Sequence, residues 1–129
     1  PTETPDKYNT LQSGGFYTIV CCIDESYSWK WQDQKLSLPI IVKTWDKNLS
    51  NINASVHVRI LYFVNGEQFT AYDKTKWTKG SEAKFGYNLD FNTPVDGYIK
   101  IEVISSYKNL KNEYEKTVYI DRSQARIYP

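Results

Sequence analysis

The fold of this chain is decided by the stretch Asn53-Ala-Ser-Val-His-Val-Arg-Ile-Leu-Tyr-Phe-Val-Asn-Gly-Glu-Gln-Phe69. Its apolar residues recur at every second position: Val56, Val58, Ile60, Tyr62 and Val64. That period is typical of a β-strand with one face in a hydrophobic core. The dipeptide Asn65-Gly66 follows, and it favours the positive φ angles of a two-residue hairpin turn. The stretch therefore predicts a long strand that turns back in an antiparallel sheet.

The same alternation recurs along the chain between polar segments. Strands are expected over 16–23, 36–47, 69–72, 85–91, 98–107 and 117–121, and an aromatic alternation covers 27–31. Polar residues dominate 73–82 and 105–113, which are interpreted as connections, and residues 1–14 are interpreted as a linker with little structure. No window carries the 3.6-residue period of a helix. Seven or eight short strands at this spacing predict an all-β domain over residues 15–129, either a two-sheet antiparallel sandwich or a barrel.

Length and charge narrow the classes of protein. The 129 residues fit one domain that buries its own core. Sixteen basic and fifteen acidic residues give a formal net charge of +1, which argues against a nucleic-acid partner. No run of eighteen apolar residues is present, so we expect no membrane insertion.

The two cysteines, Cys21 and Cys22, are adjacent in an expected strand. Neighbouring strand residues point to opposite faces, so a disulfide between these two would be strained. Cys21 is expected on the apolar face with Tyr17 and Ile19, and therefore buried. A redox pair or an intermolecular bridge through Cys22 is the alternative.

Residues that carry chemistry are few. His57 is the one histidine, with no nucleophile or partner that the sequence can assign to it. One histidine and two adjacent cysteines make no zinc pattern, and no glycine-rich phosphate loop occurs. Asp24, Asp46 and Asp96 are equivalent candidates for a calcium loop, and nothing ranks one above another. We expect no catalytic residue, metal or cofactor, and hence no enzyme.

Aromatic residues are the one compositional excess, at 16% of the chain. Tyr27, Trp29 and Trp31 would share one face of an extended segment, either as a ligand platform or as part of the core. Trp77 lies in the polar run Lys74-Thr-Lys-Trp-Thr-Lys79 and is expected to be exposed. Trp45 ends an apolar strand and is expected to be buried. The candidate ligand-binding residues are therefore Trp77, Tyr27, Trp29 and Trp31.

Three runs carry a resemblance to known modules: Ile41-Val-Lys-Thr-Trp45, Ala54-Ser-Val-His-Val58 and Thr93-Pro-Val-Asp-Gly-Tyr-Ile-Lys-Ile-Glu-Val103. With them, residues 36–120 resemble the immunoglobulin-like and fibronectin-like sandwich modules of extracellular proteins. The resemblance implies an immunoglobulin-like sandwich in a secreted or cell-surface protein. The Cys–Trp–Cys framework of true immunoglobulin domains is absent.

Two functional hypotheses follow. The first is a non-catalytic binding module of a secreted or surface protein, which takes a polysaccharide or glycan on exposed aromatic rings. The second is a structural or adhesive spacer, whose aromatic residues fill the core and whose surface contacts a partner protein. Such sandwiches serve both purposes, so the fold alone assigns no function.

Overall fold

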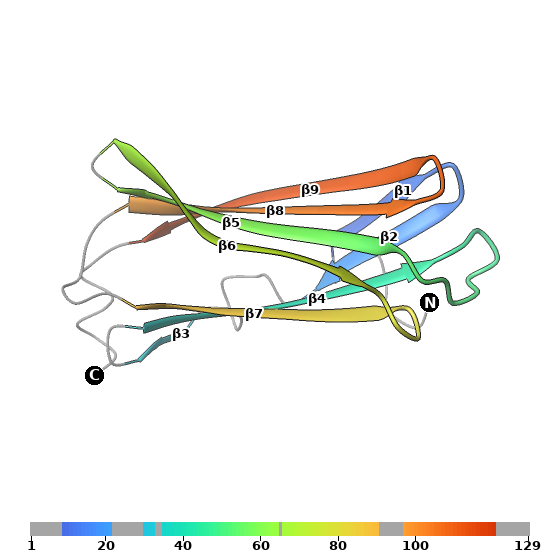
Figure 1. The fold of residues 1–129 in the computed structure, drawn as a ribbon, viewed down its shortest axis with the longest axis horizontal. Helices are drawn as coiled ribbons and strands as arrows, with labels where there is room; N and C mark the ends of the chain where they lie inside the picture. Colours follow the sequence, from blue (N-terminus) through green and yellow to red (C-terminus); the bar gives the residue numbers. More distant parts are fainter. Residues whose placement is uncertain (1–8, 22–29, 33–34, 65, 91–96, 121–129) are drawn as a thin grey trace.

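The computed structural model describes residues 9–21, 30–32, 35–64, 66–90 and 97–120. In chain order its nine strands are β1 (Asn9–Ser13), β2 (Phe16–Cys21), β3 (Lys30–Gln32), β4 (Lys35–Trp45), β5 (Ser55–Val64), β6 (Glu67–Trp77), β7 (Glu82–Asp90), β8 (Gly97–Tyr107) and β9 (Leu110–Ile120). All strand pairs are antiparallel, and the strands form two sheets that face each other (Figure 1). The fold is therefore an all-β, two-sheet sandwich. Within these residues no helix is long and apolar enough to span a membrane.

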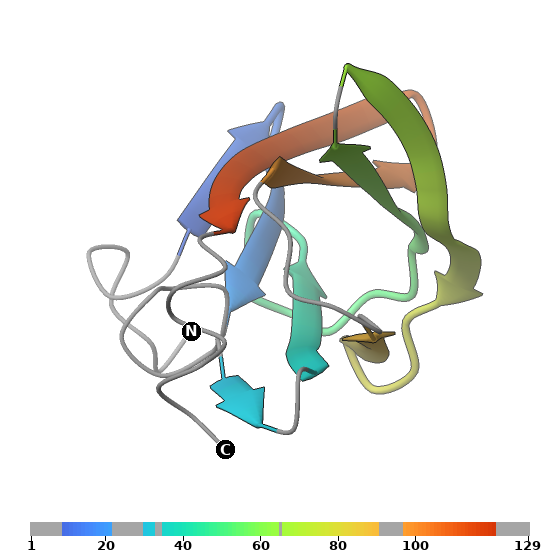
Figure 2. The same ribbon diagram turned by 90° about the vertical axis from the view of Figure 1, so that its left-hand side faces the viewer.

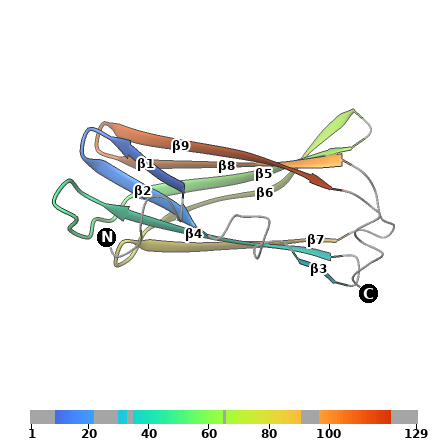
Figure 3. The same ribbon diagram turned by 180° about the vertical axis from the view of Figure 1, so that it is seen from behind.

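One sheet has the strand order β1-β2-β4-β7, with β3 paired to the first residues of β4. The other has the order β6-β5-β8-β9. Figure 2 shows the two layers from one end, with the tip of the β5–β6 hairpin projecting from the sandwich. On one side β1 and β2 lie against β9 (Figure 3), where Ser13 Oγ donates a hydrogen bond of 2.9 Å to the Lys111 carbonyl oxygen.

The predicted hairpin is confirmed. Val64 pairs with Glu67, which leaves two residues in the turn, and Gly66 has a φ of +77°. The inward side chains of β5 are completely buried at Val56, Val58 and Ile60. The strand lies between β6 and β8, so its apolar face is at the centre of the four-stranded sheet.

Both sheets contribute to one hydrophobic core. Its buried members are Val20, Ile40, Val42, Ala83 and Phe85 from one sheet and Val56, Val58, Ile60, Ile99, Ile101 and Val103 from the other. Each fully buried side chain of this size contributes roughly 1.5–3 kcal/mol relative to exposure. Tyr62 and Tyr114 pack against the edge of this core, and burial raises the pKa of both phenols. The alternation of side chains along the strands of both sheets thus directs apolar residues into one shared core, whose burial stabilises the sandwich.

Buried hydroxyl groups also join the sheets. Thr18 of β2 is completely buried, and its Oγ1 lies 2.6 Å from Ser105 Oγ of β8. Asn112 Nδ2 of β9 donates to Thr18 Oγ1 at 2.9 Å and to the Phe16 carbonyl oxygen at 3.0 Å. A buried polar group is tolerated when it is hydrogen-bonded, so these residues stay inside without a large desolvation cost.

This network explains one wrong expectation. The face of β2 turned toward the other sheet is the set Phe16, Thr18 and Val20, not the set of Tyr17 and Ile19, although Ile19 is buried as well. Thr18 is polar and interrupts the apolar pattern of that face, so the sequence does not mark the face as buried. Hydrogen bonds offset the cost of burying Thr18. The side chain of Cys21 and all of Cys22 lie outside the described residues.

Two segments expected to lack strand structure are strands. Residues 9–13 of the predicted linker form β1, which pairs with β2. Much of the expected connection 105–113 belongs to β8 and β9, joined by a turn at 108–109. In both cases hydrogen bonds to a neighbouring strand outweigh the polar composition, which is a weak guide to strand formation.

The third difference is β6, which continues to Trp77 through part of the expected connection 73–82. Lys74 and Lys76 lie opposite Val58 and Val56, on the inward side of this edge strand. Lys76 Nζ reaches across to donate a hydrogen bond of 2.7 Å to the Lys84 carbonyl oxygen of β7. Inward lysines at an edge discourage pairing with a second chain, and they also remove the apolar alternation that marks a strand in sequence.

Pro39 lies in the middle of β4. β2 pairs with residues 41–45 of β4 and β3 pairs with residues 35–37, so Pro39 falls between the two pairings on that edge. On the opposite edge its partner is Gly86 of β7. A proline is tolerated at this gap between the β2 and β3 pairings, because its missing N–H removes no hydrogen bond between strands.

We expect Gly97→Ala to destabilise the domain by about 1–3 kcal/mol. A methyl group at Gly97 would clash with the backbone carbonyl oxygen of Phe63 on β5, so β5 and β8 would have to separate. Gly86→Ala is the matched control, since nothing lies within 4 Å of its added methyl group. Urea denaturation compares the two variants, and equal midpoints would contradict the close approach of β5 and β8.

Candidate functional site: the outer face of the four-stranded sheet

The outer face is the side of the β6-β5-β8-β9 sheet that turns away from the other sheet. Alternation on β5 sends Ser55, His57 and Arg59 to this face, because Val56 and Val58 between them are buried. The facing positions on β6 and β8 follow from the strand register. A core strand therefore also supplies the centre of an exposed, polar surface.

Trp77 lies on this outer face. It is the last residue of β6 and pairs with Ser55, and its side chain is 65% exposed. The prediction that Trp77 is exposed is confirmed, whereas its placement in a loop was wrong. Asp73 and Thr75 precede it on the same face of β6, at steps of two residues.

A β-bulge decides which face Trp77 occupies. From the hairpin to Leu61 the two strands pair without interruption, and Leu61 pairs with Thr70. Ile60 then pairs with Tyr72, so Ala71 is an extra residue in β6. One inserted residue exchanges the two faces of everything beyond it. Without this bulge Trp77 would be on the inward side of the sheet.

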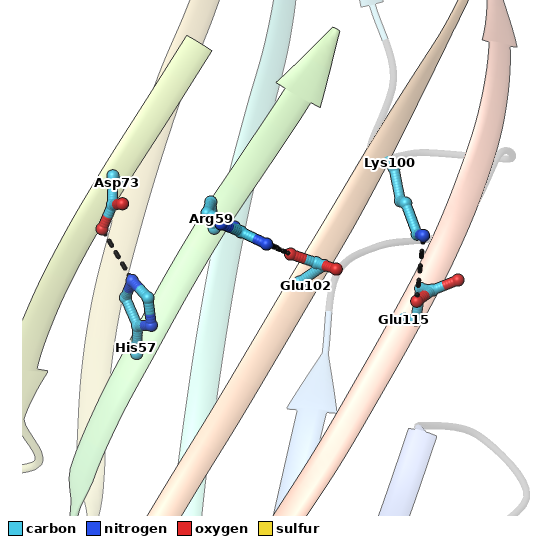
Figure 4. A network of polar contacts seen from close by, with 6 residues as sticks. All are labelled: His57, Arg59, Asp73, Lys100, Glu102 and Glu115. Carbon is cyan, nitrogen blue, oxygen red and sulfur yellow. Dashed lines mark hydrogen bonds and ion pairs between the residues drawn. The ribbon is translucent and has the colours of Figure 1, made fainter. Parts of the chain in front are cut away.

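His57 and Asp73 form a hydrogen-bonded pair close to Trp77. The imidazole Nε2 lies 2.6 Å from Asp73 Oδ1, and the side chains are 38% and 53% exposed (Figure 4). His57 is thus no isolated surface residue, because its partner comes from the neighbouring strand. Because both side chains remain partly exposed, their other polar atoms can still bind polar groups of a ligand.

Two ion pairs continue across the same face (Figure 4). Arg59 of β5 contacts Glu102 of β8, with Nε–Oε1 and Nη2–Oε1 distances of 2.8 and 2.7 Å. Lys100 of β8 lies 3.4 Å from Glu115 of β9. Charges in the middle of the face are therefore paired with one another.

We define the Trp77 patch as Trp77, Thr75 and Asp73 of β6 with Ser55 and His57 of β5. It combines one exposed indole with hydroxyl, imidazole and carboxylate groups on adjoining positions of two strands. The indole offers an apolar face, and the other groups offer hydrogen-bond donors and acceptors. Such a surface suits a ligand that has apolar and hydroxylated sides.

The base of this patch is rigidly held. Thr78 follows Trp77, and its N–H donates to the Ala54 carbonyl oxygen at 2.9 Å. In return the Ala54 N–H donates to Thr78 Oγ1 at 2.8 Å, and both residues are completely buried. Thr44 of the opposite sheet adds a contact of 3.1 Å to Thr78 Oγ1 and a hydrogen bond of 2.9 Å to the Ile52 carbonyl oxygen. The Trp77–Ser55 pair is therefore fixed to both sheets.

The other predicted aromatic residues are placed only in part. Tyr27 and Trp29 lie outside the described residues. Trp31 belongs to β3 and pairs with Leu36, while its side chain also lies outside the described part. Trp45, which was expected to be buried, is only partly buried, because it stands at the end of β4 next to the 46–54 loop.

A second aromatic feature occupies the far end of the outer face. Phe63 and Tyr98 pair across β5 and β8, with ring centroids 4.4 Å apart and planes inclined by 14°. Phe63 lies eight positions along β5 from Ser55, or about 27 Å of extended strand. These rings stack on each other, so they leave less free surface than Trp77 does.

In the described part of the chain, no group of three metal-ligating side chains comes together. Asp46, one of the calcium candidates, uses its Oδ1 to accept the N–H groups of Asn48 and Ser50 at 2.8 and 2.9 Å. It therefore stabilises the loop backbone. Asp24 and Asp96 lie outside the described residues.

No protein-family model matches this chain, and neither does any curated protein or solved structure with which it was compared. The physical arrangement of its own residues therefore carries the functional argument.

We expect Trp77→Ala to change the free energy of unfolding by less than about 0.5 kcal/mol, since its side chain is largely exposed. Phe16→Ala should cost about 3–5 kcal/mol, because that ring is completely buried. Denaturant melts of both variants make the comparison. If Trp77→Ala proved as destabilising as Phe16→Ala, the indole would belong to the core and not to a contact surface.

Proposed function

We propose that this chain is a non-catalytic carbohydrate-binding module of a secreted or cell-surface protein, and that the Trp77 patch is its binding site. The observation that carries the proposal is an indole, 65% exposed, on the same sheet face as the His57–Asp73 pair. The chain exposes few large apolar side chains otherwise: in the described residues only Leu49 and Phe69 join Trp77.

The chemistry of sugars suits this surface. A pyranose ring presents C–H groups on its faces and hydroxyl groups at its rim, so it stacks on an aromatic face while its rim forms hydrogen bonds. The Trp77 ring would take the C–H face, since aromatic rings bury apolar area at low entropic cost. Asp73, His57 and Thr75 would take the hydroxyl groups, as acceptors and donors on the same surface.

A non-catalytic role is supported by the state of the carboxylates. A glycosidase holds two carboxyl groups across a cleft, at a separation that its mechanism fixes. Here Asp73, Glu102 and Glu115 lie on an open sheet face, and each contacts a basic or imidazole group. Carboxylates engaged in this way stabilise the surface and are poorly placed as acid and base.

The strand order supports the resemblance to immunoglobulin-like modules. In such domains strands A, B, E and D form one sheet and C, F and G the other, with C′ beside C in some members. No strand of the described residues takes the place of D. The orders β2-β4-β7 and β6-β5-β8-β9 match this pattern if β2, β4, β5, β6, β7, β8 and β9 are lettered A, B, C, C′, E, F and G. β1 and β3 are then additions to the first sheet.

The alternative is a structural or adhesive spacer that contacts a partner protein. Its support is the self-paired charge of the outer face, where Arg59–Glu102 and Lys100–Glu115 need no ligand. The exposed Trp77 favours the binding module, because a spacer gains nothing from an indole in water.

A glycan array with the wild-type protein, followed by binding measurements on its strongest ligand, tests the proposal. Trp77→Ala should weaken binding by about 1–3 kcal/mol, the range of a truncated aromatic hot spot, or roughly 5- to 150-fold. Phe69→Ala is the matched control: its ring is 47% exposed on the same strand, but it lies near the hairpin and contacts Tyr62.

The control variant should keep wild-type affinity. Binding that Trp77→Ala leaves intact would place the site elsewhere. An array on which the wild-type protein retains no glycan would favour the spacer.

A further inference from the structure

We propose that the carbohydrate bound at the Trp77 patch is acidic, a polymer with carboxylate or sulfate groups. This inference rests on the proposed function and adds the charge class of the ligand. It comes from an unbalanced group of lysines at one end of the sandwich. We call this end the turn end: it carries the turns 14–15, 78–81 and 108–109 and the loop 46–54 (Figure 1, right).

Trp77 and one of these lysines share a row across the outer face. Trp77 pairs with Ser55, Ser55 with Ser106, and Ser106 with Lys111. Neighbouring strands are about 4.8 Å apart, so the row spans ~14 Å from the indole to the lysine. It presents a ring, two hydroxyl groups and an ammonium group in line, and Lys111 is exposed. That sequence of groups suits a sugar chain with a negative substituent.

Three further lysines lie in the turns and the loop of the turn end. Lys79 follows Trp77 by two residues, Lys108 lies in the turn before β9, and Lys47 follows β4 and approaches Gly15. All three are exposed. Lys108 Nζ lies 5.2 Å from the centroid of the Tyr107 ring, a contact that leaves its charge uncompensated.

The carboxylates at this end do not balance the four lysines. Asp46 accepts two backbone N–H groups and offsets one positive charge, and Glu82 is paired with Lys84 at 3.7 Å. Glu113 remains, two residues from Lys111 on the same face of β9. The middle of the outer face differs, since each basic group there has an acidic partner (Figure 4). Among the described residues, the turn end therefore carries an excess of positive charge that the middle of the outer face lacks.

The exposed lysines of the turn end should therefore favour acidic ligands over neutral ones. Exposed lysines attract anions over about one Debye length, ~8 Å at physiological salt, and this attraction weakens as salt is added. A neutral glycan can gain only hydrogen bonds from Lys79 or Lys111, whereas an acidic one also gains charge attraction at each contact. Single-stranded nucleic acid also combines anionic and stacking groups, but the chain as a whole has a net charge of only +1.

The test compares matched polymers in affinity electrophoresis: polygalacturonate with its methyl ester, carboxymethylcellulose with hydroxyethylcellulose, and dextran sulfate with dextran. In at least one pair the acidic member should bind more tightly, and the preference should shrink between roughly 0.05 and 0.5 M NaCl. The double variant Lys79→Gln/Lys111→Gln should weaken acidic binding roughly 2- to 30-fold, the range expected when two exposed ion pairs are lost.

Lys100→Gln is the matched control, because that lysine is paired with Glu115 and lies away from Trp77. Equal binding of the neutral and acidic members would overturn the charge class and leave the proposed function standing. Failure of every polymer and of the glycan array would overturn both. Tighter binding of oligothymidylate than of any acidic polymer would also overturn the inference, since the ligand would then be a nucleic acid.

Discussion

The single-residue bulge at Ala71 is the constraint on which the functional surface depends. Strand side chains alternate between faces, so the extra residue exchanges the faces of residues 72–77 relative to the hairpin. It sends Asp73 and Trp77 outward and turns Lys74 and Lys76 inward. One backbone irregularity thus creates an aromatic and polar surface on one side of β6. On the other side it places lysines at the free edge, where they discourage pairing with a second chain.

Much of the fold could be predicted from alternation. The β5–β6 hairpin was visible in sequence because an uninterrupted alternation ends at Asn65-Gly66, and β8 was visible for a similar reason. The inward face of β2, the end of β6 and the start of β9 were not, because a hydrogen bond can replace apolar burial. Thr18 and Asn112 are buried as a bonded group, and Lys76 crosses to the other sheet. Hydropathy patterns carry no information about such partners.

Less of the candidate site could be predicted. Composition indicated an exposed Trp77, since no apolar residue flanks it. Its neighbours His57 and Asp73 depend on the register of two strands, and that register depends on the bulge. Counting outward from the hairpin turn without the bulge places Lys76, not Trp77, opposite Ser55. The sequence shows no residue that marks the insertion, because Ala71 is an ordinary strand residue.

The central claim is that successive residues of β5 alternate between the hydrophobic core and the binding surface. An alanine scan from Ser55 to Ile60, with both unfolding and glycan affinity measured for each variant, tests it most directly. Stability should fall at Val56, Val58 and Ile60, by about 2 kcal/mol or more at Ile60, and affinity should fall at Ser55 and His57. Losses of stability and affinity at the same positions, or a core contribution from His57, would contradict the account.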